Sequence, residues 1–439
     1  MAVPRTSTLA AKLDDERPDS AAQHHCSNFA SLLYGLVLMI EPPKESLRLM
    51  IVAGEPSGDA HAAALVRALR EHSPATDFKF FGATHGAMRA AGVESIIRAD
   101  DLSITGLLEI GRALPKFWRA FQTLKQAAFE RRPDAVLLVD WPDFNLKLAR
   151  AFHSHGLKII YYISPQLWAW RSYRARGIKR DVDLLLAILP FEPDWYKARG
   201  ITHVEFVGHP LAGEVRPRYG REEFCRRHQL DSSQLLVALL PGSRRKELAR
   251  ILPPMLDAAR RVLSSRPGAR FVIPLAPTRT RAEVESVIAS AAAVGPPDES
   301  LRQALFVTQD ETREALAAAD VAAVASGTAT LEAALIGTPL VVVYKESMLN
   351  WHALRPLISV EHFGLANLVA GESIAPELLQ YDFTGERLAG ELLQLSEPEH
   401  NAAVRARLRQ AVARLGAGGA SERAAAAILR AVREWKSSQ

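Results

Sequence analysis

The residues that decide the fold of this chain run from Leu47 to Asp59 and read LRLMIVAGEPSGD. The apolar part predicts a buried strand, and the glycines of the polar part allow the backbone angles that end it. A helical pattern follows at once through Ala62, Leu65 and Leu69. In an open α/β sheet, the loop after such a strand faces the ligand crevice.

The polar loop carries two carboxylates and a hydroxyl, on Glu55, Ser57 and Asp59. A phosphate-binding loop would place amides and a lysine there, so an NTP-binding P-loop is not expected. Two interpretations remain open. The stretch is either a strand–turn–helix junction with Asp59 as a helix cap, or one wall of a site for an uncharged, hydroxyl-rich ligand such as a sugar.

Length and composition narrow the class of protein. A chain of 439 residues is too long for one compact core, so two domains are expected. A net charge of +5 suits an anionic substrate or an anionic membrane surface. Nucleic acid is not expected as a partner, because no nucleic-acid motif accompanies the charge. The two cysteines, Cys26 and Cys225, lack metal-ligand spacing, which argues against zinc and disulfides and favours a reducing cytoplasm.

Residues 1–46 differ from the rest and are expected to form a poorly structured extension. Their apolar run, Leu32–Ile40, is too short to span a bilayer. A signal peptide would need a basic region directly before this run and a small-residue cleavage site after it. The segment is interpreted either as an added surface segment or as a reading frame assigned too far upstream, with Met39 as the true start.

Short apolar runs alternate with helical patterns from residue 47 onward. Runs that are buried on both faces and separated by helices indicate parallel sheets. The alternation restarts after a charged helix, which predicts two Rossmann-like, doubly wound domains with a boundary near 210–216. The predicted divisions are 47–212, 213–397 and a helical, strand-free end at 398–439. The main apolar runs are 47–53, 79–81, 135–139, 158–163, 184–189 and 203–207 in the first domain and 235–240, 271–275, 321–325 and 340–344 in the second.

A loop of the second domain, Pro241–Arg245, is suited to a pyrophosphate. It follows a strand and opens a helix, so free amides, the helix dipole and Arg244 would attract an anion. The alternative is a turn with solvated arginines.

A second junction of this kind begins at Ser326. The small residues Gly327 and Thr328 let a ligand approach the helix start, and Glu332 could bind ribose hydroxyls. The alternative is a capped helix with an incidental glutamate. Two such junctions favour a nucleotide crevice. A dinucleotide is not favoured, because the Gly-x-Gly-x-x-Gly fingerprint is absent from the sequence.

In the first domain, an apolar strand ends at Asp140, which places this residue at the crevice. Asp140 could take a proton from an attacking hydroxyl, while Asp143 and Asn145 bind or orient the substrate. Asp143 could instead be a plain first-turn helix carboxylate, since Pro142 suits the first helical position. No Asp-x-Asp signature stands near the phosphate loops, so no metal is expected.

A loop with aromatic and basic residues begins at Ser164 and contains Trp170 and Arg171. It could be a nucleic-acid platform, a membrane-interface patch, or a packed aromatic loop before a solvated basic helix. His61 and His209 each lie beside a strand end, and either could be a buried, hydrogen-bonded histidine.

Taken together, these motifs resemble the lipid-A-disaccharide synthase family from about Leu47 to the end of the chain. Each motif alone is weak, but this many in the same order are specific. They are Ala53–Asp59, Asp140–Asn145, Ser164–Arg171, Leu189–Glu192, Val207–Pro210, Leu239–Arg244, Ala325–Glu332 and Ala366–Gly371.

The resemblance implies a glycosyltransferase-B fold, in which two Rossmann-like domains face a cleft. It implies transfer of 2,3-diacylglucosamine from UDP to 2,3-diacylglucosamine 1-phosphate, with inversion, giving a β-1,6-linked disaccharide and UDP in lipid A biosynthesis. It implies no metal or other cofactor. Because both substrates carry acyl chains, the enzyme is expected to act at the inner face of the inner membrane.

The resemblance also implies residue roles. Asp140 would be the general base on the acceptor 6-hydroxyl, with Glu55 and Ser57 lining the acceptor side. Arg244 would meet the diphosphate. The other expected substrate-binding residues are Asp59, Asp143, Asn145, Trp170, Arg171, His209, Ser326, Gly327, Thr328, Glu332 (ribose) and Asn367 (donor).

The sequence departs from the family pattern in one loop. Ala83–Met88 stands where the family has Gly-Pro-Arg-Met, so an arginine is missing, although Arg89 lies close by. Leu167 replaces a serine or valine, and the N-terminal extension has no family counterpart.

Two other function classes are kept as alternatives. One is another UDP-sugar enzyme of this fold, a UDP-N-acetylglucosamine 2-epimerase or a lipid-linked sugar transferase. The other is a non-catalytic nucleotide-sugar or nucleic-acid binder. The sequence leaves open the acyl chain length, the acyl linkage, the docking surface and the oligomeric state, for which a homodimer is one option.

Overall fold

The computed structural model describes residues 45–102, 110–292, 299–355 and 360–438. The expectations for residues 1–44, including the apolar run and Met39, lie outside this part. Residues 45–46 form a small unit with residues 75–77, in which the Asp77 N–H donates to the Glu45 carbonyl at 2.7 Å. The other described residues belong to one larger unit. No helix in the described ranges is long and apolar enough to cross a bilayer.

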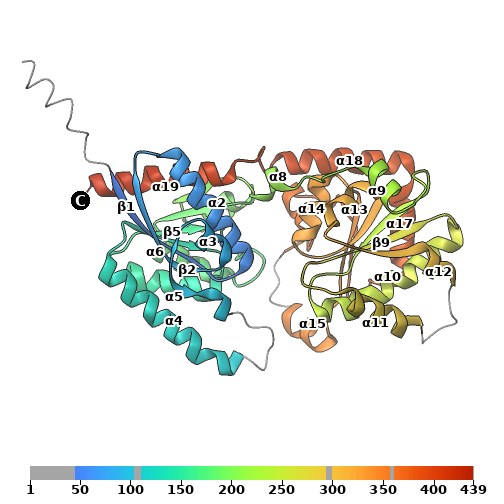
Figure 1. The fold of residues 1–439 in the computed structure, drawn as a ribbon, viewed down its shortest axis with the longest axis horizontal. Helices are drawn as coiled ribbons and strands as arrows, with labels where there is room; N and C mark the ends of the chain where they lie inside the picture. The colour runs from blue at the N-terminus through green and yellow to red at the C-terminus, as the bar shows by residue number, and fades with distance from the viewer. Residues whose placement is uncertain (1–44, 103–109, 293–298, 356–359, 439) are drawn as a thin grey trace, which may run out of the picture. The chain divides into compact units, whose positions relative to one another are not determined.

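The first part of the chain forms a seven-stranded sheet of order β3-β2-β1-β4-β5-β6-β7, in which the paired strands run parallel (Figure 1). The strand order reverses between β1 and β4, as in doubly wound folds. The strands are β1 Ser46–Ala53, β2 Asp77–Thr84, β3 Glu94–Arg98, β4 Ala135–Val139, β5 Ile159–Tyr162, β6 Leu184–Ala187 and β7 Val204–Phe206.

Helices separate these strands. They are α2 Pro56–His72, α3 Gly86–Ala90, α4 Ile110–Arg131, α5 Pro142–His153, α6 Ala175–Asp181, α7 Glu192–Lys197 and α8 Leu211–Glu214, with 3-10 turns η1 Ala99–Leu102 and η3 Ser172–Arg174.

The next part of the chain forms a six-stranded parallel sheet of order β10-β9-β8-β11-β12-β13, which reverses between β8 and β11. The strands are β8 Leu236–Leu240, β9 Arg270–Leu275, β10 Leu305–Gln309, β11 Val321–Ala325, β12 Leu340–Tyr344 and β13 Glu377–Leu379. The helices are α9 Arg221–Arg227, α10 Arg245–Ser265, α11 Arg281–Ala292, α12 Glu299–Ala304, α13 Thr312–Ala318, α14 Thr328–Ile336, α15 Met348–Leu354, α16 Leu365–Ala370, α17 Gly385–Ser396, α18 Pro398–Ala413 and α19 Ala420–Ser437.

The central strands are apolar throughout because both faces of each sheet are covered. In β1, Leu49 and Ile51 pack into one core, while Met50 and Val52 pack into the core on the other face. This follows from the two-residue period of a strand. The predicted fold class, two doubly wound parallel sheets, is confirmed.

The last two helices pack on different cores. Helix α18 contributes Val404 and Leu408 to the core of the second sheet. Helix α19 contributes Ala424 and Ile428 to the core that contains β1 and α2, and Figure 1 shows it in red beside these blue elements. Helix α19 therefore completes the core that contains β1 and α2.

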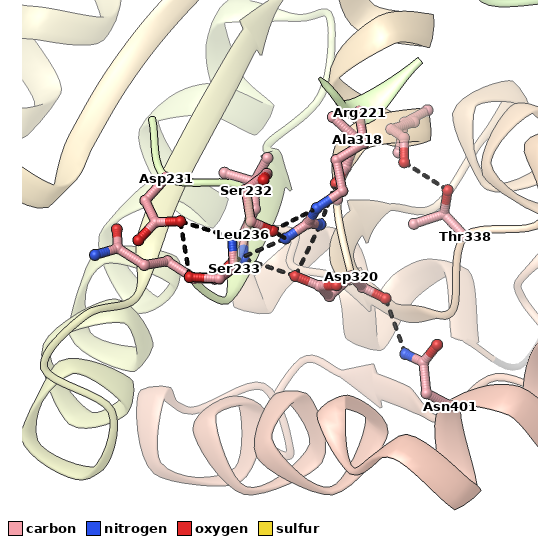
Figure 2. A network of polar contacts seen from close by, with 12 residues as sticks. Arg221, Asp231, Ser232, Ser233, Leu236, Ala318, Asp320, Thr338 and Asn401 are labelled. Carbon is pink, nitrogen blue, oxygen red and sulfur yellow. Dashed lines mark hydrogen bonds and ion pairs between the residues drawn. The ribbon is translucent and has the colours of Figure 1, made fainter. Parts of the chain in front are cut away.

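A polar network closes the amino-terminal edge of the second sheet (Figure 2). Arg221 donates to the Ser232 carbonyl at 3.1 Å and forms an ion pair with Asp320 at 3.0 Å. The Asp320 carboxylate accepts the Leu236 N–H, and its carbonyl accepts the Asn401 side-chain amide, both at 2.9 Å. The network fixes α9, α18 and two strands at the edge away from the strand ends that face a ligand.

Candidate active site

Four of the loops that the sequence singled out lie at the switch points of the two sheets. In the first sheet Ala53 pairs with Val139, so the loop after β1 and Asp140 after β4 begin at the same level. In the second sheet Leu240 pairs with Val324, which brings together the loops that begin at Pro241 and Ser326. Ligand crevices of doubly wound sheets form at these points.

Asp140 has a strained backbone that its neighbours hold in place. Asp140 and Trp141 have φ of 50° and 52°, in the left-handed region that costs roughly 1–2 kcal/mol per non-glycine residue. The Asp140 carbonyl accepts the Tyr161 hydroxyl at 2.7 Å and the Asn145 amide at 2.8 Å. The Asp140 N–H donates to the Tyr162 carbonyl at 3.1 Å. These bonds turn the chain sharply at the end of β4.

The Asp140 side chain has the titration behaviour of a base that works near neutral pH. Burial, followed by the negative charge of Glu55, raises its pKa to about 6, and a hydrogen bond from the Trp141 backbone opposes both effects. A carboxylate with such a pKa takes up a proton more readily than an exposed aspartate.

Trp141 covers the loop after β1. A Cβ added to Gly54 would lie 2.0 Å from the Trp141 ring, so only glycine fits there. Trp141 stacks on Phe144 with ring centroids 4.1 Å apart, and Phe117 of α4 packs against it at 5.9 Å. The sequence carries no signal for this role of Trp141, because its contact with Gly54 joins residues far apart in the chain.

The three polar residues of the first loop differ in their surroundings. Glu55 and Ser57 are exposed, whereas Asp59 is buried. Asp59 accepts N–H bonds from His85 at 2.8 Å and from Ala87 at 2.7 Å. Asp59 therefore caps α3 rather than its own helix, whose N-cap is Glu55. The described contacts of Asp59 are structural.

In the sequence, His85 stands out only as part of the divergent loop Ala83–Met88. It is buried, and its ring nitrogens lie 2.9 Å from Asp100 Oδ1 and 3.2 Å from the Gly54 carbonyl. Arg89 donates to the other Asp100 oxygen at 2.7 Å, and the two partners lower the pKa of Asp100, Arg89 more than His85. This series of contacts, from Arg89 through Asp100 and His85 to the Gly54 carbonyl, supports the backbone of the first loop.

Asn145 is fully buried and binds backbone. Besides Asp140, its amide nitrogen approaches the Val139 carbonyl at 3.2 Å and the Val52 carbonyl at 3.4 Å. Asn145 therefore joins the ends of β1 and β4. Its described contacts position Asp140, and none of them is with an open surface.

The aromatic and basic loop is built on a buried carboxylate. Trp168 donates its indole N–H to Glu192 at 3.1 Å, and burial raises the pKa of Glu192 to about 7. Trp170 is 39% exposed, and the Arg171 guanidinium lies over its ring at 4.1 Å. Arg171 forms an ion pair with Asp143 at 2.9 Å.

A cavity of about 710 Å³ lies at the switch point of the second sheet. Among its lining residues are the predicted Arg244, Ser326, Gly327, Thr328 and Glu332. Burial raises the pKa of Glu332, and Arg313 at 3.6 Å opposes this effect. The volume is in the range of ligand pockets.

The helix start in this cavity differs from the expectation of free amides. Glu247 accepts N–H bonds from Ser243 and Arg244, both at 3.1 Å, and lies 3.2 Å from the Arg244 guanidinium. The Arg244 side chain remains 83% exposed.

A smaller cavity of about 410 Å³ shares Ser326, Gly327 and Thr328 with the first. Its lining is largely apolar and includes Trp168 and Trp170. The start of α14 therefore borders a charged cavity and an apolar one.

Two predicted residues, Asn367 and His209, have structural contacts. Asn367 is fully buried and accepts the Ile374 and Ala375 N–H groups at 2.9 and 2.8 Å. His209 is buried and accepts the Leu211 N–H at 3.2 Å. Burial, followed by the charge of His61, lowers the pKa of His209 to about 4. The two cavities described above are lined by six of the predicted residues, Trp170, Arg244, Ser326, Gly327, Thr328 and Glu332. Their linings include neither Asn367 and His209 nor Asp140 and the remaining predicted residues of the first sheet.

The family profile and the sequence relatives point to one family. The profile of a family described as lipid-A-disaccharide synthetase matches residues 49–431. The lipid-A-disaccharide synthase of Trichlorobacter lovleyi is 42% identical over 388 residues, covering 88% of this chain and 98% of that protein. The enzyme of the same name from Geobacter sulfurreducens is 40% identical over 385 residues, covering 88% and 97%.

Solved structures show the same fold at low identity. UDP-GlcNAc 2-epimerase from Neisseria meningitidis, bound to UDP-GlcNAc, aligns with a TM-score of 0.56 and 12% identity, covering 88% of this chain and all of that chain (100%). A glycosyltransferase from Rickettsia africae aligns with a TM-score of 0.54 and 11% identity, covering 89% and 99%. These likenesses show the glycosyltransferase-B type of fold, and the sequence relatives show the family.

Proposed function

This chain belongs to the lipid-A-disaccharide synthase family and is a glycosyltransferase of lipid A biosynthesis, and we propose on that premise that it joins 2,3-diacylglucosamine from UDP to 2,3-diacylglucosamine 1-phosphate. The observation that carries the proposal is the pairing of two sites. A carboxylate with a raised pKa lies at one switch point, and a nucleotide-sized cavity with arginines lies at the other. The epimerase and lipid-linked transferase alternatives are not supported by the family.

We propose that Asp140 is the general base. Its carboxylate takes the proton of the acceptor 6-hydroxyl while that oxygen bonds to the anomeric carbon of the donor. The bond from this carbon to the UDP oxygen breaks, so the configuration inverts and the bonding electrons leave with UDP. Glu55 supports the role, because its charge helps to raise the pKa of Asp140.

The second sheet would hold the leaving group. Arg244 and the helix-start amides would bind the diphosphate, since positive charge placed at the developing negative charge stabilises the transition state. Glu332 would bind the ribose hydroxyls from inside the cavity. Ser326, Gly327 and Thr328 would lie beside the donor, with Gly327 open to solvent and no atom within 4 Å of its Cβ position.

The remaining predicted residues divide into two groups. Glu55 and Ser57 are exposed and would line the acceptor side, while Trp170 with Arg171 and its partner Asp143 would contact substrate beside the apolar cavity. The buried residues would position the site rather than touch substrate. These are Asp59, Asn145, His209 and Asn367.

We further propose that the protein acts on the cytoplasmic face of the inner membrane. On α4, Leu114 and Trp118 are 61% and 65% exposed, beside the exposed cations Lys116 and Arg119. Apolar side chains next to cations favour an anionic lipid surface. The fraction of protein that sediments with anionic vesicles should fall when Leu114 and Trp118 are changed to serine. Unchanged binding would contradict the proposal that this surface contacts the membrane. Light scattering tests whether the protein is a homodimer.

The activity is tested by incubating the protein with both substrates. Disaccharide 1-phosphate and UDP should form together, in equal amounts, without added metal and in the presence of EDTA. UDP release without disaccharide would contradict the proposal, and so would failure with this pair. The same assay with substrates of different chain length would define the acyl specificity, and it should be repeated with a chain starting at Met39.

A further inference from the structure

The cavity of the second sheet is electrically balanced by its own side chains. Its lining contains four arginines (216, 218, 244 and 313) and four carboxylates (Glu247, Asp310, Glu314 and Glu332), so the formal charges cancel. Three of the arginines already contact a carboxylate of the cavity. The pairs are Arg218 with Glu314 at 2.8 Å, Arg313 with Glu332 at 3.6 Å and Arg244 with Glu247 at 3.2 Å.

Glu247 covers two backbone amides of the helix start, whereas Glu314 accepts one backbone N–H, that of Arg218 at 2.8 Å. One of its oxygens accepts the N–H groups of both Ser243 and Arg244 at 3.1 Å. A Cβ added to Gly242 would lie 2.4 Å from this oxygen, so the glycine of the loop makes room for the carboxylate. A diphosphate bound at this helix start would need the same amides.

We propose that Glu247 is an internal competitor for the diphosphate of the donor and of the product UDP. The Glu247 carboxylate and a phosphate oxygen occupy the Ser243 and Arg244 amides in turn, and Arg244 exchanges one anion for the other. The inference rests on the proposed function, because it concerns the same nucleotide site. It adds that the protein limits its own affinity for UDP, which favours release of the product.

The size of the effect follows from the strength of the contact that must open. The apparent affinity for a ligand falls by the fraction of molecules in the competent state. The stabilisation that a side-chain cap gives to a helix start is large enough to lower the fraction of molecules with free amides about twofold to thirtyfold. Removing the charge of Glu247 should therefore tighten the binding of UDP by up to about thirtyfold.

The test compares UDP with uridine on Glu247→Gln by isothermal titration calorimetry. We expect UDP to bind at least about twofold tighter than to the unchanged protein, and the concentration of UDP that half-inhibits disaccharide formation to fall in parallel. Uridine, which lacks phosphates, should bind equally to both proteins. Glu247→Ala, which removes the hydrogen-bond acceptor altogether, should also bind UDP more tightly than the unchanged protein.

Glu283 offers a matched control. It accepts the Thr280 N–H at 3.1 Å and pairs with Arg279 at 3.1 Å, so it caps α11 as Glu247 caps α10. Its side chain is 27% exposed, against 23% for Glu247, and it is not part of the cavity lining. Glu283→Gln should lower thermal stability by a similar amount and leave the UDP affinity unchanged.

The outcomes separate this inference from the proposed function. Unchanged or weaker UDP binding by both Glu247 variants would overturn the inference, while disaccharide formation by the unchanged protein would leave the function standing. A shift of the same size in Glu283→Gln would also overturn it, because the effect would then come from loss of a cap. Equal affinity of the unchanged protein for UDP and uridine would contradict the diphosphate site itself.

Discussion

At the scale of single residues, Asp140 combines a strained backbone with a raised pKa. Tyr161 and Asn145 donate hydrogen bonds to its carbonyl and so stabilise the left-handed backbone conformation, which by itself lowers the stability of the fold. Strain and perturbed pKa values concentrate at functional sites. Both features make Asp140 the residue on which the proposed chemistry is most directly tested.

Asp140→Asn should lower turnover by about 10² to 10⁴, the usual contribution of a general base, with UDP affinity unchanged. In the unchanged protein, kcat/KM should rise with pH and level off above about 6, because the base must be unprotonated. Rates measured from pH 4.5 to 8.5 check both points. A variant with near-normal turnover, or a flat profile through pH 6, would exclude Asp140 as the base.

The same variant should be more stable than the parent at high pH. The folded-state pKa of Asp140 lies above the unfolded value of 3.8, so the folded protein binds the proton more tightly. Ionisation therefore destabilises the fold as pH rises from about 4 to 6, by up to about 3 kcal/mol above pH 6. Urea unfolding of Asp140→Asn and the parent at pH 4 and pH 8 measures this difference. A variant equally destabilised at both values would indicate a structural role instead.

Glu55 has an effect that can be separated from substrate contact. Its charge is the second cause of the raised pKa of Asp140, after burial. Glu55→Gln should therefore move the acidic limb of the kcat/KM profile to lower pH. An unmoved limb with a raised KM would show that Glu55 contacts the acceptor and does not act through Asp140. Ser57→Ala, at another exposed position of this loop, serves as the comparison.

At the scale of elements, the aromatic contact between two loops sets the shape of the first site. Trp141 lies over Gly54 and packs against Phe117 of α4, the helix whose outer face carries Trp118. The loop after β1, the loop after β4 and the proposed membrane helix therefore share one packed cluster. A change in this cluster should affect the site without altering any polar residue in it.

Gly54→Ala should displace the Trp141 ring, because the new Cβ would lie 2.0 Å from it. Overpacking of this kind costs about 1–3 kcal/mol of stability, and turnover should fall with it. Thermal unfolding and the disaccharide assay measure the two effects. Gly58→Ala is the control, since its Cβ would meet no atom closer than 3.6 Å. Equal behaviour of the two variants would contradict the packing argument.

At the scale of the whole molecule, elements that are far apart in the sequence pack together in one core. The last helix, α19, completes the core that contains β1, the strand with which the described fold begins. The preceding helix, α18, belongs to the other core and is tied to its sheet by Asn401. The end of the chain therefore stabilises both halves.

Ile428→Ala in α19 should destabilise the first half by about 2–5 kcal/mol, because it deletes a fully buried side chain. Hydrogen exchange should show the loss of protection in β1 and α2 more than in β8. Glu434→Ala changes an exposed residue of the same helix and should leave exchange unchanged. Protection lost equally in both sheets would contradict the separate assignment of α19.

The two doubly wound sheets could be predicted from the sequence, because continuous apolar runs mark strands buried on both faces. The runs did not include β3, β10 and β13. The loops at the strand ends could also be predicted, since parallel strands bring their carboxyl ends to one edge. The domain limits and the substrate contacts of the site residues remain predictions.

Which polar residues face a cavity and which are buried depends on the packed fold and could not be predicted from the sequence. Asp59 and Asn367 are predicted site residues, and both are buried and accept backbone N–H groups. The donor to Asp59 is His85, 26 residues away, and the donor to Asn367 is Ile374, seven residues away. Tyr161 and His85 gave no distinct signal, because their partners are set by how loops meet. Glu247 bonds to amides three and four residues earlier, so its capping position is local, and the packed fold decides only that this helix start lines a cavity. A residue's type fixes the bonds it can form, but the packed fold determines the partners that reach it and the water that is excluded.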